Sequence, residues 1–240
     1  MAARKLSIKT NDGACAAHVF GSGTSGVILY MDAFGLRPAM DEMAERMAGL
    51  GYTVLVPDLL YRSAPYGPFD ANNTFNDEKK VVEIRAVMSA TTHVMSIADG
   101  AFFLQALSDA GATGPVGVVG YCLGGARAIN AAANYPDRIK AAASFHGGNL
   151  ASDAADSPHR SAASIKGRVY VGAAGVDRSF PPEQSAKLAE ALRTAEVDHI
   201  IENYVGKEHG WCVPDHDVYD QEGAERHWTR LETLFRETLG

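Results

Sequence analysis

Cys122 lies in a glycine-flanked pentapeptide that could hold a reactive thiol. The segment reads Gly120-Tyr121-Cys122-Leu123-Gly124. It follows the apolar run 117–119, which predicts a strand, and it precedes a stretch of small residues that predicts a helix. This context matches the G-x-S-x-G turn that presents a nucleophile between a strand and a helix, with cysteine in place of serine. The glycines are needed because larger side chains would collide with neighbouring backbone, and the helix N-terminus favours a thiolate.

Two other interpretations of this segment are a buried core cysteine and a phosphate-binding loop. A free cysteine is often simply part of a core. A phosphate-binding loop requires a lysine that is missing here, and the glycine spacing differs from the dinucleotide-binding pattern. The strand before the segment and the helix after it favour a nucleophile at Cys122.

A thiol nucleophile needs a base, and the base needs a residue that orients it. Proteins with this turn carry the nucleophile, the acid and the histidine in that chain order, each after a strand. Asp177 follows the predicted strand 168–171 through the segment 172–175, and His209 follows the predicted strand 199–204. Both would lie at the carboxyl edge of a parallel sheet, where such sheets place their sites. We therefore predict a triad of Cys122, His209 and Asp177.

Other titratable residues fit this arrangement less well. Asp198 opens a predicted strand at the opposite edge of the sheet, and His227 lies inside the predicted last helix. Asp215 and His216 lie deeper in the loop before that helix, and no strand end places His93 or His199.

Such a site requires strands that alternate with helices, and the hydrophobic pattern predicts them. An opening hairpin is predicted over 4–9 and 14–20, with its turn at Asn11-Asp12-Gly13. Further strands are predicted over 27–31, 52–56, 116–119, 139–145, 168–171 and 199–204. Helices are predicted over 38–50, 77–110 (as two helices that break near Ser89-Ala90), 122–134, 181–194 and 218–239. Residues 61–76, rich in proline, glycine and asparagine, predict a long loop.

This order of elements predicts an α/β fold with a doubly wound, mostly parallel sheet and an N-terminal antiparallel hairpin. No repeat, linker or low-complexity tract interrupts the pattern. We therefore expect residues 1–240 to form a single domain.

The overall composition restricts the classes of partner that we expect this protein to bind. The formal net charge is −7, which argues against nucleic acid and anionic membrane surfaces because phosphate binding needs concentrated lysine and arginine. Apolar runs are far shorter than the roughly 20 residues of a spanning helix, and residues 1–10 do not resemble a signal peptide. The three cysteines, Cys15, Cys122 and Cys212, do not form a disulfide pattern. We expect a cytoplasmic monomer or homodimer that acts on a small molecule.

The motifs together resemble the dienelactone hydrolase (carboxymethylenebutenolidase) family of the α/β-hydrolase superfamily. The resemblance rests on the segment 120–125, on Asp177 and on His209-Gly210, and it extends over nearly the whole chain. It also includes the turn Asp32-Ala33-Phe34-Gly35 and the segment Pro57-Asp58-Leu59. Such enzymes cleave esters or lactones with a Cys-His-Asp triad and use neither a metal nor an organic cofactor.

The resemblance implies roles for particular residues. Cys122 would be the nucleophile, His209 the base and Asp177 its orienting acid. The backbone amides of Leu123 and Ala33 would form the oxyanion hole. Asp32 stands where the family has a glutamate that contacts the resting cysteine, and this shorter acid departs from the pattern.

The substrate pocket is expected around Tyr121, His146, Trp211 and the turn that contains Phe34, bordered by the loop 61–75. For His146, a hydrogen bond to its own loop is an equally good interpretation. The family has an arginine soon after the catalytic histidine, but here His209 is followed by the segment 210–214, which has none. Arg62, Lys80 or Arg85 could supply a counter-charge, although Lys80 and Arg85 also fit a solvated helix face.

Two further functions remain open at this point. The same triad could serve a broad aryl esterase or a phosphotriesterase. Alternatively, Cys122 could be a redox or ligand-binding thiol on a hydrolase scaffold, although such a thiol needs neither the histidine nor the acid. The histidines lack a metal-binding spacing such as H-E-x-x-H, so we expect no metal site.

Overall fold

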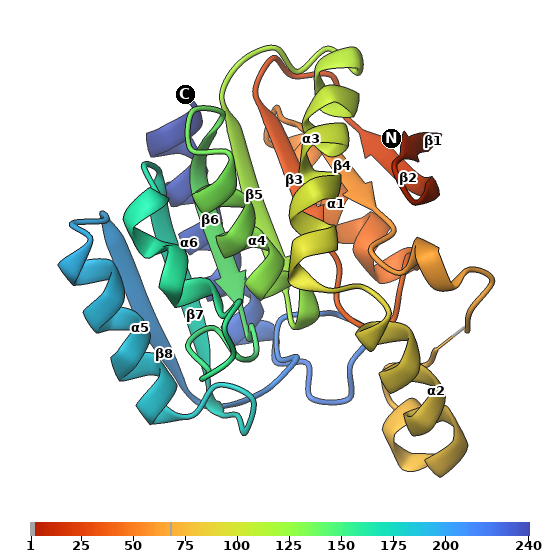
Figure 1. The fold of residues 1–240 in the computed structure, drawn as a ribbon, viewed down its shortest axis with the longest axis vertical. Helices are drawn as coiled ribbons and strands as arrows, with labels where there is room; N and C mark the ends of the chain where they lie inside the picture. Colours follow the sequence, from red (N-terminus) through yellow and green to blue (C-terminus); the bar gives the residue numbers. More distant parts are fainter. Residues whose placement is uncertain (1–2, 68) are drawn as a thin grey trace.

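The computed structural model describes residues 3–67 and 69–240, in which eight strands form one sheet flanked by helices (Figure 1). The strands are β1 (Arg4–Thr10), β2 (Gly13–Phe20), β3 (Gly26–Tyr30), β4 (Thr53–Pro57), β5 (Val116–Tyr121), β6 (Ile139–Phe145), β7 (Arg168–Val176) and β8 (His199–Glu208). The helices are α1 (Pro38–Gly49), α2 (Glu78–Ser89), α3 (His93–Asp109), α4 (Leu123–Asn134), α5 (Pro182–Thr194) and α6 (Gln221–Leu239). Short 3₁₀ turns cover Tyr61–Ser63, Thr74–Asn76 and Pro158–Ser164.

The sheet has the strand order β1-β2-β4-β3-β5-β6-β7-β8. The hairpin β1–β2 is antiparallel and joins the sheet by antiparallel pairing of β2 with β4. The remaining neighbours, from β4 to β8, pair in parallel. Helices α3, α4 and α5 lie in front of the sheet in Figure 1, and α1 and α6 lie behind it. The predicted fold class, a doubly wound and mostly parallel sheet with an antiparallel hairpin, is confirmed.

The central strands form the core. Every residue of β3, β4 and β5 is buried, as expected for parallel strands with helices on both faces. The predicted helix 77–110 is interrupted as expected near residue 90, because α2 ends at Ser89 and Thr92 caps a new helix by accepting a hydrogen bond from the Met95 amide. The last helix begins at Gln221 rather than at residue 218, because the Asp220 side chain caps it.

Strands β7 and β8 are longer than predicted. The segment 172–175, interpreted from its small residues as a connection, continues β7 and pairs with β8, for example Gly172 with Glu202. The pairing persists through a register shift to Val176 and Glu208. As a result Asp177 and His209 each follow immediately after a strand, side by side at the carboxyl edge of the sheet.

The predicted loop 61–76 contains two short 3₁₀ turns, and its residue 68 lies outside the described residues. No helix of the described residues is both long enough and apolar enough to cross a membrane.

Close backbone packing requires glycine around the turn between β5 and α4. A Cβ atom on Gly120 would lie 2.0 Å from the Gly124 carbonyl oxygen, and one on Gly124 would lie 2.1 Å from that of Tyr30. A Cβ atom on Gly125 would lie 2.4 Å from the Ser144 hydroxyl oxygen. The first turn of α4 is therefore seated directly on the ends of β3 and β6.

We expect Gly120→Ala to lower the free energy of unfolding by about 2 kcal/mol or more, because the added methyl group meets rigid backbone. Urea denaturation checks this expectation. The control is Gly49→Ala at the end of α1, where nothing lies within 4 Å of the added atom. That variant should change stability by less than about 1 kcal/mol. Equal effects of the two substitutions would contradict the close packing at the turn.

Candidate active site

Cys122 occupies a strained turn. It lies between the end of β5 and the start of α4 with φ 52° and ψ −114°, which a non-glycine residue rarely adopts. Its amide donates hydrogen bonds to the Phe145 carbonyl oxygen and to Nδ1 of His146, both at 3.1 Å. The end of β6 thus holds the turn, and the thiol, which is half-buried, stands at the N-terminus of α4.

The structure brings His209 and Asp177 together. His209 Nδ1 donates to Asp177 Oδ2 at 2.7 Å. The other carboxylate oxygen of Asp177 accepts from the Ser179 amide at 2.8 Å and from the Ser179 hydroxyl at 2.6 Å. Burial alone would raise the pKa of Asp177, but the hydrogen bonds and the charge of His209 lower it below its usual value. Asp177 therefore stays ionised and orients the imidazole.

The Cys122 sulfur is the second partner of the His209 ring. Burial alone would lower the pKa of His209, but the charge of Cys122 and hydrogen bonds with Asp177 and Cys122 raise it to about 10. The imidazole is therefore charged at neutral pH and pairs with the sulfur on one side and the carboxylate on the other. The Cys122 sulfur thus faces a charged imidazole that can donate a proton, an arrangement that suits nucleophilic chemistry at a thiol.

His146 lies beneath this pair and supports it. It is buried, with a positive φ of 39°, and its ring contacts those of His209 and Trp211 at centroid distances of 4.9 and 5.3 Å. Burial and then the charges of three nearby histidines lower its pKa well below the usual value. Because Nδ1 accepts from the Cys122 amide, the neutral ring carries its proton on Nε2, which has no partner among the described residues. This hydrogen bond goes to the turn at Cys122, whereas the alternative interpretation placed it in the loop that follows His146.

Asp32 is bound in an ion-pair network. It is fully buried and accepts from Arg37 Nη1 and Nη2 at 2.6 and 2.8 Å, and its Oδ2 lies 3.3 Å from His216 Nε2. Burial alone would raise its pKa, but the hydrogen bonds and charges of His216 and Arg37 lower it. No described contact joins Asp32 to Cys122. Asp32 therefore differs from the family glutamate in its partners, which are Arg37 and His216.

The remaining predicted pocket residues fall into two groups. Phe34 packs edge-on against Phe75 and His216, at centroid distances of 5.7 and 5.4 Å. Tyr121 and Trp211 are fully buried under the turn: the Tyr121 hydroxyl pairs with His227, and Trp211 contacts His146. Phe34 is also buried, at 6% exposure, so none of these three side chains is open to solvent.

The two arginines of the predicted pocket occupy other positions. Arg62 donates to Asp99 at 2.8 and 2.9 Å and to Asp12 at 2.6 and 2.8 Å, so its charge is already paired twice. It ties the β1–β2 turn to α3 and offers no unpaired charge to a substrate. Arg85 is exposed on α2, and its contact with a substrate stays a prediction.

Three of the residues that fitted the triad less well in the sequence analysis have partners elsewhere in the fold. His227 accepts from the Tyr121 hydroxyl at 2.8 Å, and Asp198 pairs with Arg168 at the opposite edge of the sheet. His93 accepts from Arg127 and Asn130 at 2.5 and 2.7 Å. Within residues 3–67 and 69–240, no cluster of three or more histidine, cysteine or acidic side chains could hold a metal ion.

Sequence reasoning missed two residues of the site, Ser179 and Arg37. Ser179 follows Asp177 by two residues, a spacing typical of an Asx turn, so this signal was available. Arg37 carried no comparable signal for its pair with Asp215, which lies 178 residues away in the sequence.

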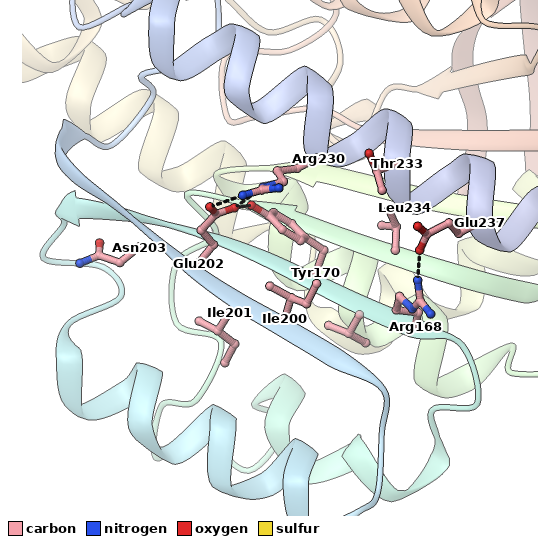
Figure 2. A pocket seen from close by; sticks show the side chains of 11 residues that line it. Arg168, Tyr170, Ile200, Ile201, Glu202, Asn203, Arg230, Thr233, Leu234 and Glu237 are labelled. Atoms are coloured by element: carbon pink, nitrogen blue, oxygen red, sulfur yellow. Dashed lines mark hydrogen bonds and ion pairs between the residues drawn. The ribbon is translucent and has the colours of Figure 1, made fainter.

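A groove of about 440 Å³ lies between β8 and α6 (Figure 2). Its lining includes Arg168 and Ile200, which lie at the start of β7 and β8, whereas Asp177 and His209 follow the ends of these strands. Ion pairs of Glu202 with Arg230 and of Arg168 with Glu237 span the groove. The groove therefore lies towards the amino-terminal ends of β7 and β8, away from the carboxyl edge that holds Asp177 and His209.

The model of the dienelactone hydrolase family matches residues 15–239. The chain belongs to the dienelactone hydrolase family. It is therefore a hydrolase of the ester and lactone class. The Synechocystis protein named "Putative carboxymethylenebutenolidase" is 29% identical over 223 residues, covering 89% of this chain and 86% of that protein.

Solved structures show the same fold. The Klebsiella pneumoniae protein titled "Putative Dienelactone Hydrolase" superposes with a TM-score of 0.83 at 22% identity and covers 98% of both chains. A dienelactone hydrolase-like promiscuous phosphotriesterase from metagenomic libraries has a TM-score of 0.75 at 24% identity and covers 100% of this chain and 99% of its own.

We expect iodoacetamide to alkylate Cys122 before the other two thiols. Cys15 and Cys212 are buried, and burial raises the pKa of Cys15 to about 12 and that of Cys212 well above its usual value. Because the His209 charge is present below pH 10, labelling of Cys122 should remain fast at pH 6–7, where an ordinary thiol is slow. Mass mapping after stoichiometric labelling checks both points. First labelling at Cys15 or Cys212 with activity intact would contradict the assignment.

Proposed function

We propose that the chain hydrolyses carboxylic esters or lactones by acyl transfer to Cys122. One observation carries this proposal: the His209 ring hydrogen-bonds with Asp177 at 2.7 Å, and the nearby Cys122, on a strained turn, raises the pKa of His209. An imidazole that exchanges a proton with the nucleophile, and an acid that orients the imidazole, make a complete triad. The family membership favours hydrolysis over a redox or ligand-binding thiol.

The proposed reaction has two halves. The Cys122 thiolate attacks the ester carbonyl carbon, and the carbonyl oxygen becomes an oxyanion. When this intermediate collapses, the C–O bond breaks and the His209 imidazolium donates its proton to the departing alkoxide. The resulting thioester is then attacked by water, whose proton the neutral imidazole accepts, and the acid leaves as the thiolate and imidazolium are restored.

Two backbone amides support the proposed oxyanion hole. Leu123 is the first residue of α4, and an amide at that position has no acceptor within its own helix. Ala33 follows β3, and the close contact of Gly124 with the Tyr30 carbonyl places the loop after β3 against the first turn of α4. Donors fixed in this way before reaction need no reorganisation as the oxyanion forms.

The triad predicts graded losses of turnover. With p-nitrophenyl acetate, Cys122→Ala should abolish the triad reaction. His209→Ala should lower kcat by about 10²–10⁴-fold because proton transfer is lost. Asp177→Asn should have a smaller effect, because the base remains but is misoriented.

Cys15→Ala is the matched control for the thiol, since Cys15 is buried in β2, and it should keep its activity. Full kcat for Asp177→Asn across the pH range would show that another acid orients His209. An aryl phosphotriester in the same panel tests the alternative reaction on the same thiol.

The charges near the site favour a neutral substrate. Arg37, at the end of the loop after β3, is already paired with two carboxylates, those of Asp32 and Asp215. The segment after His209 is apolar where the family has an arginine, and it includes the buried Trp211. A substrate carboxylate would gain no unpaired cation from Arg37 or from the segment 210–214, and losing water without one costs several kcal/mol.

We expect kcat/KM to be higher for a neutral aryl acetate than for anionic dienelactone, with little dependence on salt. Rates measured at low and high ionic strength check this expectation. A strong preference for the anion that weakens with salt, and is lost in Arg85→Ala but not in Arg46→Ala, would show that a basic subsite exists on α2.

A further inference from the structure

Arg37 joins two loops of the site through four hydrogen bonds to carboxylate oxygens. Its guanidinium donates to both oxygens of Asp32, at 2.6 and 2.8 Å. It also donates to both oxygens of Asp215, from Nε at 2.6 Å and from Nη2 at 2.9 Å. The Arg37 side chain is only 11% exposed and Asp32 is fully buried, so this pair is shielded from water, whereas the pair with Asp215 lies at the surface. Bidentate pairs of this kind fix geometry as well as adding energy.

One end of this network controls the loop that contains Ala33. Asp32 Oδ1 accepts from the Phe34 amide at 3.0 Å, and this bond closes a turn around Ala33. Asp32 is fully buried, so its position is set by Arg37, by His216 and by this turn. The direction of the Ala33 amide therefore follows from where Arg37 holds the Asp32 carboxylate.

The other end controls the loop that follows His209. Asp215 and its neighbour His216 belong to this loop, and His216 Nε2 approaches Asp32 Oδ2 at 3.3 Å. A Cβ atom on Gly210 would lie 2.4 Å from His216 Nδ1, so the residue next to His209 packs directly on this ring. The loop that presents the base and the loop that presents the Ala33 amide are thus fastened to each other.

We propose that Arg37 is a positioning residue that aims the Ala33 amide at the oxyanion. This inference rests on the proposed acyl transfer to Cys122. It assigns Asp32 to the support of the oxyanion hole, without a proton-transfer role at the thiol, because its oxygens are engaged by Arg37, His216 and the Phe34 amide.

The test compares two reactions of the same thiol. An aldehyde analogue of the substrate adds to Cys122 through a new S–C bond, and its carbonyl oxygen must be stabilised by the oxyanion hole before His209 protonates it. Iodoacetamide is attacked at a methylene carbon and releases iodide, so it requires the thiolate but no oxyanion hole. A positioning role at the Ala33 amide affects the first reaction and spares the second.

The variants are Arg37→Gln, which removes the charge, and Asp215→Asn, which weakens only the outer pair. Asp215 is 39% exposed, so its substitution keeps the test informative if Arg37→Gln is too unstable to purify. The matched control is Arg46→Gln. Arg46 forms a similar bidentate pair with Glu225, at 2.7 and 2.6 Å, between α1 and α6 and away from both loops.

With p-nitrophenyl acetate we expect kcat to fall about 10- to 100-fold in Arg37→Gln and less in Asp215→Asn, with KM within about twofold. Inhibition by the aldehyde should weaken by a similar factor, and the alkylation rate should stay at the wild-type value. Arg46→Gln should match the wild type in all three measurements.

Three outcomes would overturn the proposal. Alkylation that falls in parallel with kcat would place the effect on the thiol, and a raised KM with unchanged kcat would place it on substrate binding. If Arg37→Gln gave the same values as Arg46→Gln, the ion pairs of Arg37 would only stabilise the fold and would have no positioning role. A wild-type protein that hydrolyses no ester and binds no aldehyde would contradict the proposed function itself, and this result is distinct from the other three.

Discussion

The backbone of Cys122 is the constraint on which the rest of the site depends. A non-glycine residue at φ 52° and ψ −114° costs on the order of 1–3 kcal/mol, and it persists only where its surroundings hold it. Here the Cys122 amide is bound by Phe145 and His146, and the first turn of α4 packs on β3 through Gly124. At this turn the chain leaves the line of β5, and Cys122 lies beside His209.

Two buried carboxylates serve this turn in different ways. Asp177 is bound by Ser179 and directs its remaining oxygen to His209, so its charge is used to orient and stabilise the imidazolium. Asp32 has its oxygens occupied by Arg37, His216 and the Phe34 amide, so its charge is used to hold a loop. Both have a lowered pKa despite burial, because donors surround each of them.

Two histidines in contact, His209 and His146, differ in charge because their surroundings shift their pKa values in opposite directions. His209 has a pKa raised to about 10 because a carboxylate and a sulfur face it. His146 touches the same ring, yet burial and the adjacent positive charge keep it neutral. A neutral His146 can accept from the Cys122 amide, which a charged ring could not do. The charge on one histidine therefore helps to keep its neighbour in the form that supports the turn.

The sequence alone determined the fold class, the order of the elements and the members of the predicted triad. These features rest on local signals: apolar runs for buried strands, glycines around Cys122, and the chain order of Asp177 and His209 after strands. The break between α2 and α3 was also predictable, since α2 ends near residue 90 and Thr92 caps the next helix.

The tertiary structure decided what depends on contacts between distant segments. Residues 172–175 have little strand propensity of their own, and only pairing with β8 makes them part of β7. Arg37 is an ordinary charged residue until the fold brings Asp215 to it from 178 positions away. The sequence position of Arg62 fitted a substrate pocket, but in the fold its guanidinium is paired with Asp99 and Asp12. A charged side chain pairs with whichever partner the packed chain places beside it, and local sequence does not contain that information.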